Sequence, residues 1–265
     1  MKTRTNFRLP KEHGAWAMLY VPMIVGLLVA AKFPLRAIAL AAAATFLFIA
    51  RESLLVWWRG RSRGQKQESA RRAMLIYLAL AALFAAPLVL INHLYWLVPA
   101  AALSLALLAI NAEQAVRRED RTITGEMIAI AGLTMTAPMA YYAARGSWDM
   151  TAAWLWALCA LYFASSVFYV KLRVYSLSAR KEELRRQTWR RCAFYHGSLL
   201  VGLLLLALTG KLNLFAIAAF APIFGRTFWF MTRPANQINL KRIGLLEIIF
   251  SVVFLVFITL TFRIG

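Results

Sequence analysis

Residues 37–58, AIALAAAATFLFIARESLLVWW, give the clearest indication of how this chain folds. Its only charged residues are the neighbours Arg51 and Glu52. A helix needs roughly 20 apolar residues to cross the hydrocarbon core of a bilayer, and this run is long enough. Its side chains do not alternate between apolar and polar as they do in the strands of a membrane barrel. The stretch therefore predicts a transmembrane helix with a charged interruption near one end.

Apolar runs of the same kind recur along the whole chain. The sequence is 62% hydrophobic, whereas soluble domains are about half apolar. The runs are residues 14–31, 37–58, 73–91, 96–111, 125–144, 152–170, 192–209, 213–231 and 243–262. We predict an all-α, polytopic integral membrane helical bundle of about nine transmembrane helices, with residues 1–265 forming a single transmembrane helical domain.

The basic residues lie between the apolar runs. A net charge of +20 suits nucleic acid or a membrane surface, and this distribution favours the membrane, so no nucleic acid is expected as a partner. With the N-terminus in the cytoplasm, 24 Lys and Arg residues fall in inner segments and five in outer ones. Cytoplasmic loops carry such an excess. We predict a cytoplasmic N-terminus and two long inner loops, 59–72 and 171–191.

Ionisable residues inside apolar runs are candidates for a functional site, because charge is costly in lipid. Arg51 and Glu52 point about 100° apart on a helix, so each is expected to find a partner on another helix or to reach the interface. Two interpretations stay open. The pair either extends its charges toward the membrane surface or handles an anion or a lipid headgroup.

Four further candidates have equally plain structural explanations. His13, in LPKEHGAW (9–16), either anchors the first helix at the interface or titrates near neutral pH. Glu126 either interacts favourably with the helix dipole in the first turn of its predicted helix or belongs to a functional site. Glu247 is expected to need a buried partner, for which Arg226 is suitable, and His196 stands alone. Cys159 and Cys192 offer no disulfide framework, and no phosphate-binding loop, dinucleotide fingerprint or zinc-binding pair occurs.

Two families resemble this pattern. Nine helices, an inner N-terminus and long inner loops after the second and sixth spans are similar to the UbiA superfamily of intramembrane prenyltransferases. TITGEMIAIAGLTMTAPMAYYAARG, residues 122–146, resembles a helix of its menaquinone-pathway members. More narrowly, PKEHGAWA (10–17), RESLLVWWRGR (51–61) and NLKRIGLLEIIFSVVF (239–254) resemble the YwiC-like membrane family. The resemblance implies a UbiA-like topology and a location in the bacterial cytoplasmic (inner) membrane.

The chain departs from UbiA where that superfamily binds a Mg²⁺-diphosphate through two Asp-rich motifs. The first region, residues 50–61, holds Glu52 as its only acid, with Arg59 nearby. The second, residues 162–177, holds Lys171 and Arg173 and no acid. Cations in these positions favour direct binding of an anionic head. No metal ligands and no cofactor are predicted, although Mg²⁺ would suit the resemblance.

The working hypothesis is a protein that binds a lipid or isoprenoid with an anionic head in a cytoplasm-facing cavity. A membrane lipid, an isoprenoid or a quinone precursor is the expected partner. If it is an enzyme, it is a divergent UbiA-like transferase that lacks the Asp-rich site, with Glu52 and Glu126 as base or orienting group. The residues expected to bind the substrate are His13, Arg51, Arg59, Lys171 and Arg173. The alternatives are a small-anion transporter or permease and a non-enzymatic membrane assembly component.

Overall fold

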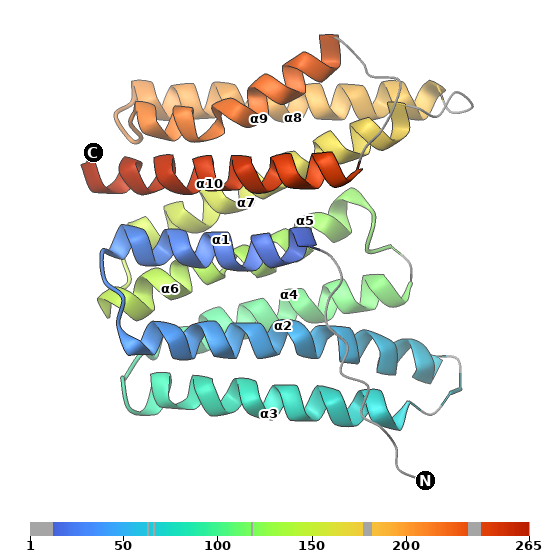
Figure 1. The fold of residues 1–265 in the computed structure, drawn as a ribbon, viewed down its shortest axis with the longest axis vertical. Coiled ribbons are helices and arrows are strands. Elements are labelled where there is room, and N and C mark those ends of the chain that lie inside the picture. Colours follow the sequence, from blue (N-terminus) through green and yellow to red (C-terminus); the bar gives the residue numbers. More distant parts are fainter. Residues whose placement is uncertain are drawn as a thin grey trace. The chain divides into compact units, whose positions relative to one another are not determined.

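The structure, a computed structural model, describes residues 13–62, 64–65, 67–117, 119–176, 182–232 and 240–264. These residues form ten helices and no strand, which confirms the all-α class (Figure 1). The helices are α1 (His13–Ala30), α2 (Leu35–Ser62), α3 (Glu68–Leu90), α4 (Leu97–Val116), α5 (Ile123–Thr134), α6 (Thr136–Arg145), α7 (Met150–Ser176), α8 (Glu182–Leu208), α9 (Leu214–Thr232) and α10 (Leu240–Ile264).

The predicted membrane class is confirmed by the lengths of these helices. In the described part of the chain, eight segments are long and apolar enough to cross a membrane, with α5 and α6 counting as one. The first helix is apolar but shorter, over Gly14–Ala30. Each predicted run overlaps one helix or, for 125–144, this consecutive pair. The predicted span 96–111 was too short, because α4 continues to Val116 through a more polar last turn.

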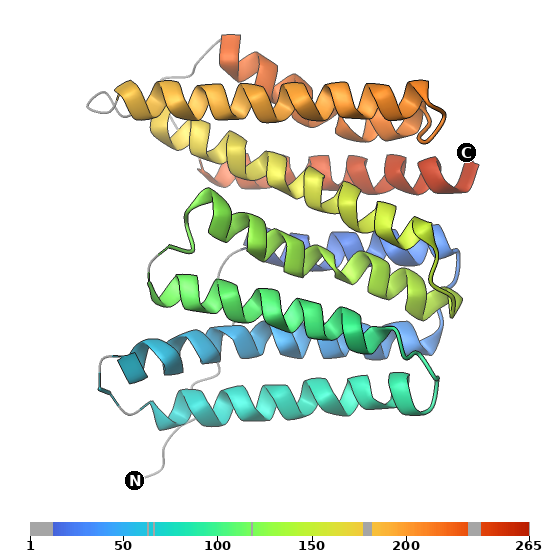
Figure 2. The same ribbon diagram turned by 180° about the vertical axis from the view of Figure 1, so that it is seen from behind.

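The chain divides into two compact units, Met1–Trp156 and Ala157–Gly265, here called unit 1 and unit 2. In unit 1, successive spans run in opposite directions and are joined by short loops (Figures 1 and 2). The ends predicted to face the cytoplasm are called inner ends and the opposite ones outer ends. Helices α2 and α3 pack along each other, and α1 packs against α6. Gly26 permits the second contact, since a Cβ there would lie 2.2 Å from the Ala137 carbonyl oxygen.

The break between α5 and α6 has a local cause. Pro138 has no N–H to donate to the carbonyl four residues earlier, and its ring crowds that carbonyl; α5 ends at that residue, Thr134. The Thr136 hydroxyl lies within hydrogen-bond distance of the carbonyl oxygens of Leu133 (2.9 Å) and Leu19 (2.8 Å). The contact with Leu19 fastens the broken span to α1.

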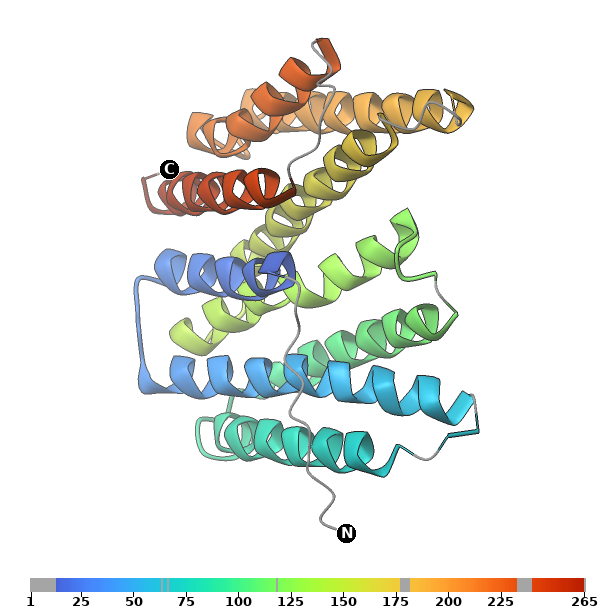
Figure 3. The ribbon, with the colours of Figure 1, turned by 45° about the vertical axis from the view of Figure 1, so that its right-hand side comes forward.

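Unit 2 consists of α7 from Ala157 onward together with α8, α9 and α10. Helices α9 and α10 lie side by side, as Figure 3 shows in orange and red, and α8 packs on α9. The core is aromatic: the rings of Tyr162 and Phe254 stack with centroids 4.1 Å apart, and Phe220 meets Phe254 edge-on. The Tyr195 hydroxyl donates to the Leu161 carbonyl at 2.6 Å. These contacts hold the four helices of unit 2 together.

Candidate functional site

The first polar site lies in unit 1, where α2, α4 and α5 meet. Arg51 donates from Nη2 (2.6 Å) and Nε (3.3 Å) to Oδ1 of Asn111. The Asn111 amide nitrogen donates to the Gly125 carbonyl at 3.1 Å. Asn111 is only 2% exposed, and its amide orientation follows from these partners. A single asparagine therefore links three helices and fixes the guanidinium of Arg51.

Glu52 shares the same guanidinium. Its Oε1 lies 3.0 Å from Arg51 Nη1, and the two side chains are 19% (Arg51) and 31% (Glu52) exposed. The expectation of a partner on another helix is confirmed for Arg51. Arg51 and Glu52 nevertheless pair with each other, because a long arginine side chain bends across the angle of about 100° between them. The pair thus stays local to α2.

Two more predicted residues lie at the same inner ends. Arg59 donates from Nη2 (2.9 Å) and Nε (3.3 Å) to the Ala115 carbonyl in the last turn of α4, where a cation favours the helix dipole. Glu126 is in the first turn of α5. Thr122 caps that helix, because its hydroxyl accepts from the Gly125 N–H at 3.1 Å. Gly125 is required there, since a Cβ would lie 2.7 Å from the Glu119 carbonyl oxygen.

We call Arg51, Glu52, Arg59, Asn111 and Glu126 the unit 1 cluster. It unites four of the seven predicted site residues. Lys171 and Arg173 belong to unit 2, near the end of α7, where the Arg173 guanidinium lies 4.3 Å from the centre of the Phe230 ring. His13 begins α1, and its side chain lies outside the described residues. Sequence reasoning missed Asn111, although an asparagine at the end of an apolar run was a usable signal.

The second polar site lies inside unit 2. Arg226 of α9 forms an ion pair with Glu247 of α10, which confirms the predicted partnership. Their side chains are 8% (Arg226) and 21% (Glu247) exposed. Ser166 donates to Glu247 Oε2 at 2.6 Å, and the Arg226 guanidinium lies 4.4 Å from the centre of the Tyr169 ring. An ion pair in an apolar span with added hydrogen bonds is held more tightly than a surface pair.

His196 extends this site and does not stand alone, so that prediction was wrong. Its Nδ1 lies 2.9 Å from the Cys192 carbonyl oxygen, which only accepts, so Nδ1 is the donor. Nε2 lies within hydrogen-bond distance of the hydroxyls of Thr227 (3.2 Å) and Ser165 (3.3 Å), one of which can donate to it. Ser165 also lies 3.5 Å from Arg226 Nη2. Together with Arg226, Glu247 and Ser166, these side chains form the unit 2 cluster, which joins α7, α8, α9 and α10.

Another carboxylate, Asp149, lies between two spans. Asp149 Oδ2 accepts from the Tyr141 hydroxyl (2.8 Å), and Oδ1 accepts from the Thr151 N–H (2.8 Å). Burial acts to raise the pKa of Asp149, but these hydrogen bonds, aided by the charge of Arg145, outweigh it and lower the pKa below the ordinary value. The contact ties the end of α6 to the start of α7 within unit 1.

Across the described ranges, no group of three or more His, Cys, Asp and Glu side chains is placed to hold a metal ion. Both cysteines, Cys159 and Cys192, are buried as free thiols. The fold and its two clusters define a polytopic helical membrane protein with ionisable groups embedded in its spans.

The chain belongs to the family described as YwiC-like protein, whose model matches residues 9–141, half of the chain. Neither a search of curated proteins nor one of solved structures found a match. The matched segment contains the whole unit 1 cluster and ends before α7 begins.

Proposed function

We propose that this protein binds a membrane amphiphile, a lipid or an isoprenoid, by its anionic head at the inner ends of its helices in the bacterial cytoplasmic membrane. One observation carries the proposal: charged residues from separate segments, around 51–59 and 126, converge at one end of α2, α4 and α5. Asn111 holds the Arg51 guanidinium in place before any ligand arrives. Such preorganisation lowers the entropy cost of binding.

The chemistry of the cluster suits a phosphate or diphosphate. Guanidinium groups bind phosphate oxygens through short, charge-assisted hydrogen bonds. Arg51 exchanges Glu52 for the incoming head, and Arg59 turns its remaining N–H groups toward it. Lys171 and Arg173, near the end of α7, give unit 2 positive charge of the same kind. The proposal needs no metal ion, because the cations neutralise the head directly.

A transferase activity would extend this binding. The acceptor's attacking atom forms a bond to the prenyl carbon, and the bond between that carbon and the diphosphate oxygen breaks. The electron pair leaves with the diphosphate, and the proton of the acceptor passes to Glu52 or Glu126. Stabilisation of the departing charge by fixed guanidinium groups is the usual source of rate in such reactions.

The test is binding of radiolabelled farnesyl diphosphate to the detergent-solubilised protein, with farnesol as the uncharged comparison. Arg51→Lys keeps the charge but loses the two-point contact with Asn111. Arg59→Gln and the pair Lys171→Ala/Arg173→Ala remove charge. Arg117→Gln is the matched control, because Arg117 is exposed at the same end and pairs with Glu113 at 2.8 Å.

A hydrogen bond to a charged group contributes about 1.5–3 kcal/mol, so we expect at least about tenfold weaker binding for each cluster variant. The Arg117 control should change affinity less than about twofold, since surface pairs contribute little. Equal binding of farnesol, or equal weakening by the control, would contradict the proposal. Binding that requires Mg²⁺ would contradict it as well, and the Lys171→Ala/Arg173→Ala pair measures whether the cations of unit 2 contribute.

A second candidate function is transport of a small anion. The Arg226–Glu247 pair favours it, because ionisable pairs inside spans mark ion and substrate pathways in transporters. The break between α5 and α6 is a further feature that transporters share. Counterflow uptake of labelled phosphate into proteoliposomes tests it. Uptake that Glu247→Gln abolishes and Glu52→Gln preserves would support transport, and no uptake above empty liposomes would reject it for this anion.

A further inference from the structure

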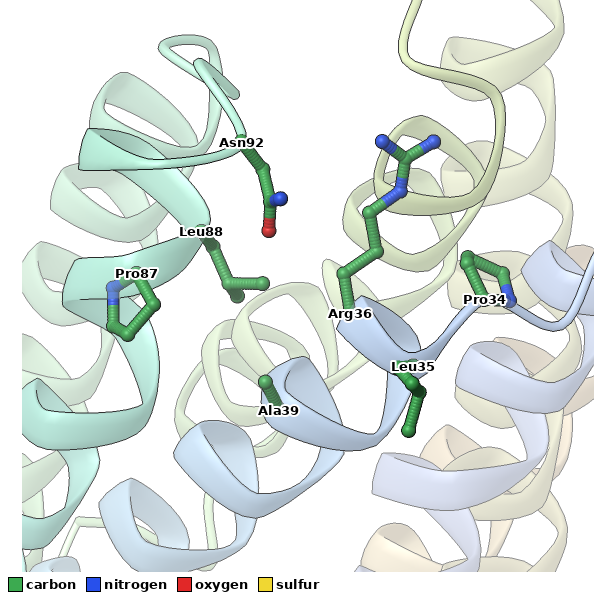
Figure 4. A pocket seen from close by; sticks show the side chains of 7 residues that line it. All are labelled: Pro34, Leu35, Arg36, Ala39, Pro87, Leu88 and Asn92. Carbon is green, nitrogen blue, oxygen red and sulfur yellow. The ribbon is translucent and has the colours of Figure 1, made fainter.

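A shallow cavity of about 400 Å³, widely open to its surroundings, lies at the outer end of unit 1, opposite to the unit 1 cluster. Figure 4 shows it between the start of α2 and the end of α3. Arg36 and Asn92 line it with polar groups that face the same space, and Leu35, Ala39, Pro87 and Leu88 give it apolar walls. The predicted cytoplasm-facing cavity remains a prediction, and this one lies at the other end of the helices.

The arginine in this cavity is held in place, but not all of its N–H donors have partners in the described part of the chain. Arg36 Nη2 donates to the Ala144 carbonyl at 3.0 Å, near the end of α6. Its Nε is buried and has no hydrogen-bond partner among the described residues. Buried N–H donors are nearly always paired, so one that is not requires an explanation. The single bond to Ala144 therefore does not use the full donor capacity of the Arg36 guanidinium, which lines the cavity.

The asparagine across the cavity is held by its own loop. The Asn92 N–H donates to the Pro87 carbonyl at 3.1 Å, and the Leu94 N–H donates to the Leu88 carbonyl at 3.0 Å. These bonds close the turn after α3 and leave the Asn92 side chain exposed toward Arg36. The first turn of α2 borders the same space and adds the positive end of a helix dipole. All the polar features of the cavity favour an anion with hydrogen-bond acceptors.

The surroundings of the cavity are apolar. Leu35 on its rim is 85% exposed, and the neighbouring Leu90 and Ile91 are also exposed. Large apolar side chains at this level of a membrane protein contact lipid chains. A ligand that fills the cavity therefore meets a cation and an amide at its head and lipid-facing apolar surface immediately beside it. This combination fits a phospholipid better than a free ion.

We infer that this cavity binds the phosphate of an anionic bilayer phospholipid, with its oxygens on the Arg36 guanidinium and the Asn92 amide and its chains along Leu35 and Pro87. The inference is independent of the function proposed for the inner ends, since it rests on other residues in another place. It assigns unit 1 a lipid site that holds the α2–α3 pair at the membrane boundary.

The test is native mass spectrometry of the full chain released from gentle detergent after equilibration with dioleoyl phosphatidylglycerol. Dioleoylglycerol, which lacks the phosphate, and free glycerol phosphate are the comparison probes. Arg36→Gln removes the cation. Lys32→Gln is the matched control, because Lys32 is an exposed cation three residues before the start of α2 that does not line the cavity. Ala39→Phe fills the cavity and leaves the Arg36 contact with Ala144 in place.

We expect one phosphatidylglycerol to remain bound per chain, with Arg36→Gln and Ala39→Phe each lowering its occupancy about tenfold and Lys32→Gln changing it less than twofold. Equal loss in the Arg36 and Lys32 variants would overturn the inference in favour of general surface charge. Equal retention of dioleoylglycerol, tight binding of free glycerol phosphate, or an unaffected Ala39→Phe variant would overturn it too. If Arg36→Gln does not fold, Ala39→Phe and the two probes still decide.

Discussion

The two intramembrane Arg–Glu pairs show how differently the same two side chains can serve a helical membrane protein. Arg51 and Glu52 are neighbours on α2, and their pairing joins no helices. Arg226 and Glu247 lie on α9 and α10, so their pairing is itself a link between spans. In unit 1 that link is made by Asn111 instead. Glu52 can therefore exchange its partner without loosening the helices. Glu247 both neutralises Arg226 and holds α9 and α10 together.

The largest expected effect comes from breaking the unit 2 pair. Glu247→Gln leaves the Arg226 charge without its counter-ion among apolar helices, and removal of one partner of a buried pair costs about 3–5 kcal/mol. The equivalent Glu52→Gln should cost about 1 kcal/mol or less, because its pair is more exposed and Asn111 remains. The measurement is the free energy of unfolding in mixed detergent micelles.

The double variant Arg226→Met/Glu247→Leu controls for this prediction. It removes both charges, and an apolar replacement of a buried pair is often neutral or stabilising. We expect it to recover most of the stability that Glu247→Gln loses, which gives a coupling energy well above that of Arg51 with Glu52. Equal losses in the two Glu→Gln variants would show that the two pairs are equivalent.

The next effect sharpens the contrast from the unit 1 side. Asn111→Ala removes the link between α2, α4 and α5, and it leaves the Arg51 guanidinium without its acceptor on α4. A hydrogen bond to a charged group contributes about 1.5–3 kcal/mol. The same unfolding assay should therefore rank Asn111→Ala below Glu247→Gln and above Glu52→Gln. A loss smaller than that of Glu52→Gln would mean that the charged pair, and not the asparagine, holds unit 1 together.

The sequence alone predicts the helices of this fold well and its polar contacts unevenly. Bilayer thickness constrains the length of apolar runs so strongly that all nine appear as helices. The Arg226–Glu247 ion pair was also predictable, because an acidic side chain inside a span needs a basic partner and few basic residues lie within the apolar runs. The exact break at Met135 was not foreseen, although Pro138 was visible in the sequence.

Contacts between distant polar residues were beyond sequence reasoning. Asn111 and Arg51 are 60 residues apart, and only the packing of α4 on α2 brings them together. The hydroxyls around His196 belong to serine and threonine, which are common residues. Such hydroxyls bond to a carbonyl of their own helix as often as to a group on another helix. Their meeting depends on the rotation of each helix about its axis, which an apolar run does not specify. The roles of Lys171 and Arg173 in binding remain predictions for the same reason.

The smallest effect concerns Asp149, a carboxylate outside the spans that contrasts with both embedded pairs. Its hydrogen bonds lower its pKa in the folded state. A lowered pKa means that the folded protein binds the proton less readily than the unfolded chain, so Asp149 contributes stability above the unfolded pKa, about 3.9. That contribution is lost as the pH falls through the folded pKa.

Asp149→Asn should therefore lower stability slightly at pH 7, by about 1 kcal/mol or less, and should flatten the decline of the wild-type protein below about pH 4. Thermal unfolding between pH 7 and pH 3 measures both. Glu52→Gln serves as the comparison, because it removes a carboxylate that lies in a span and leaves Asp149 in place. If the stabilities of the Asp149→Asn and Glu52→Gln variants decline in parallel below pH 4, the hydrogen bonds to Asp149 do not cause the acid sensitivity. The embedded carboxylates then cause it.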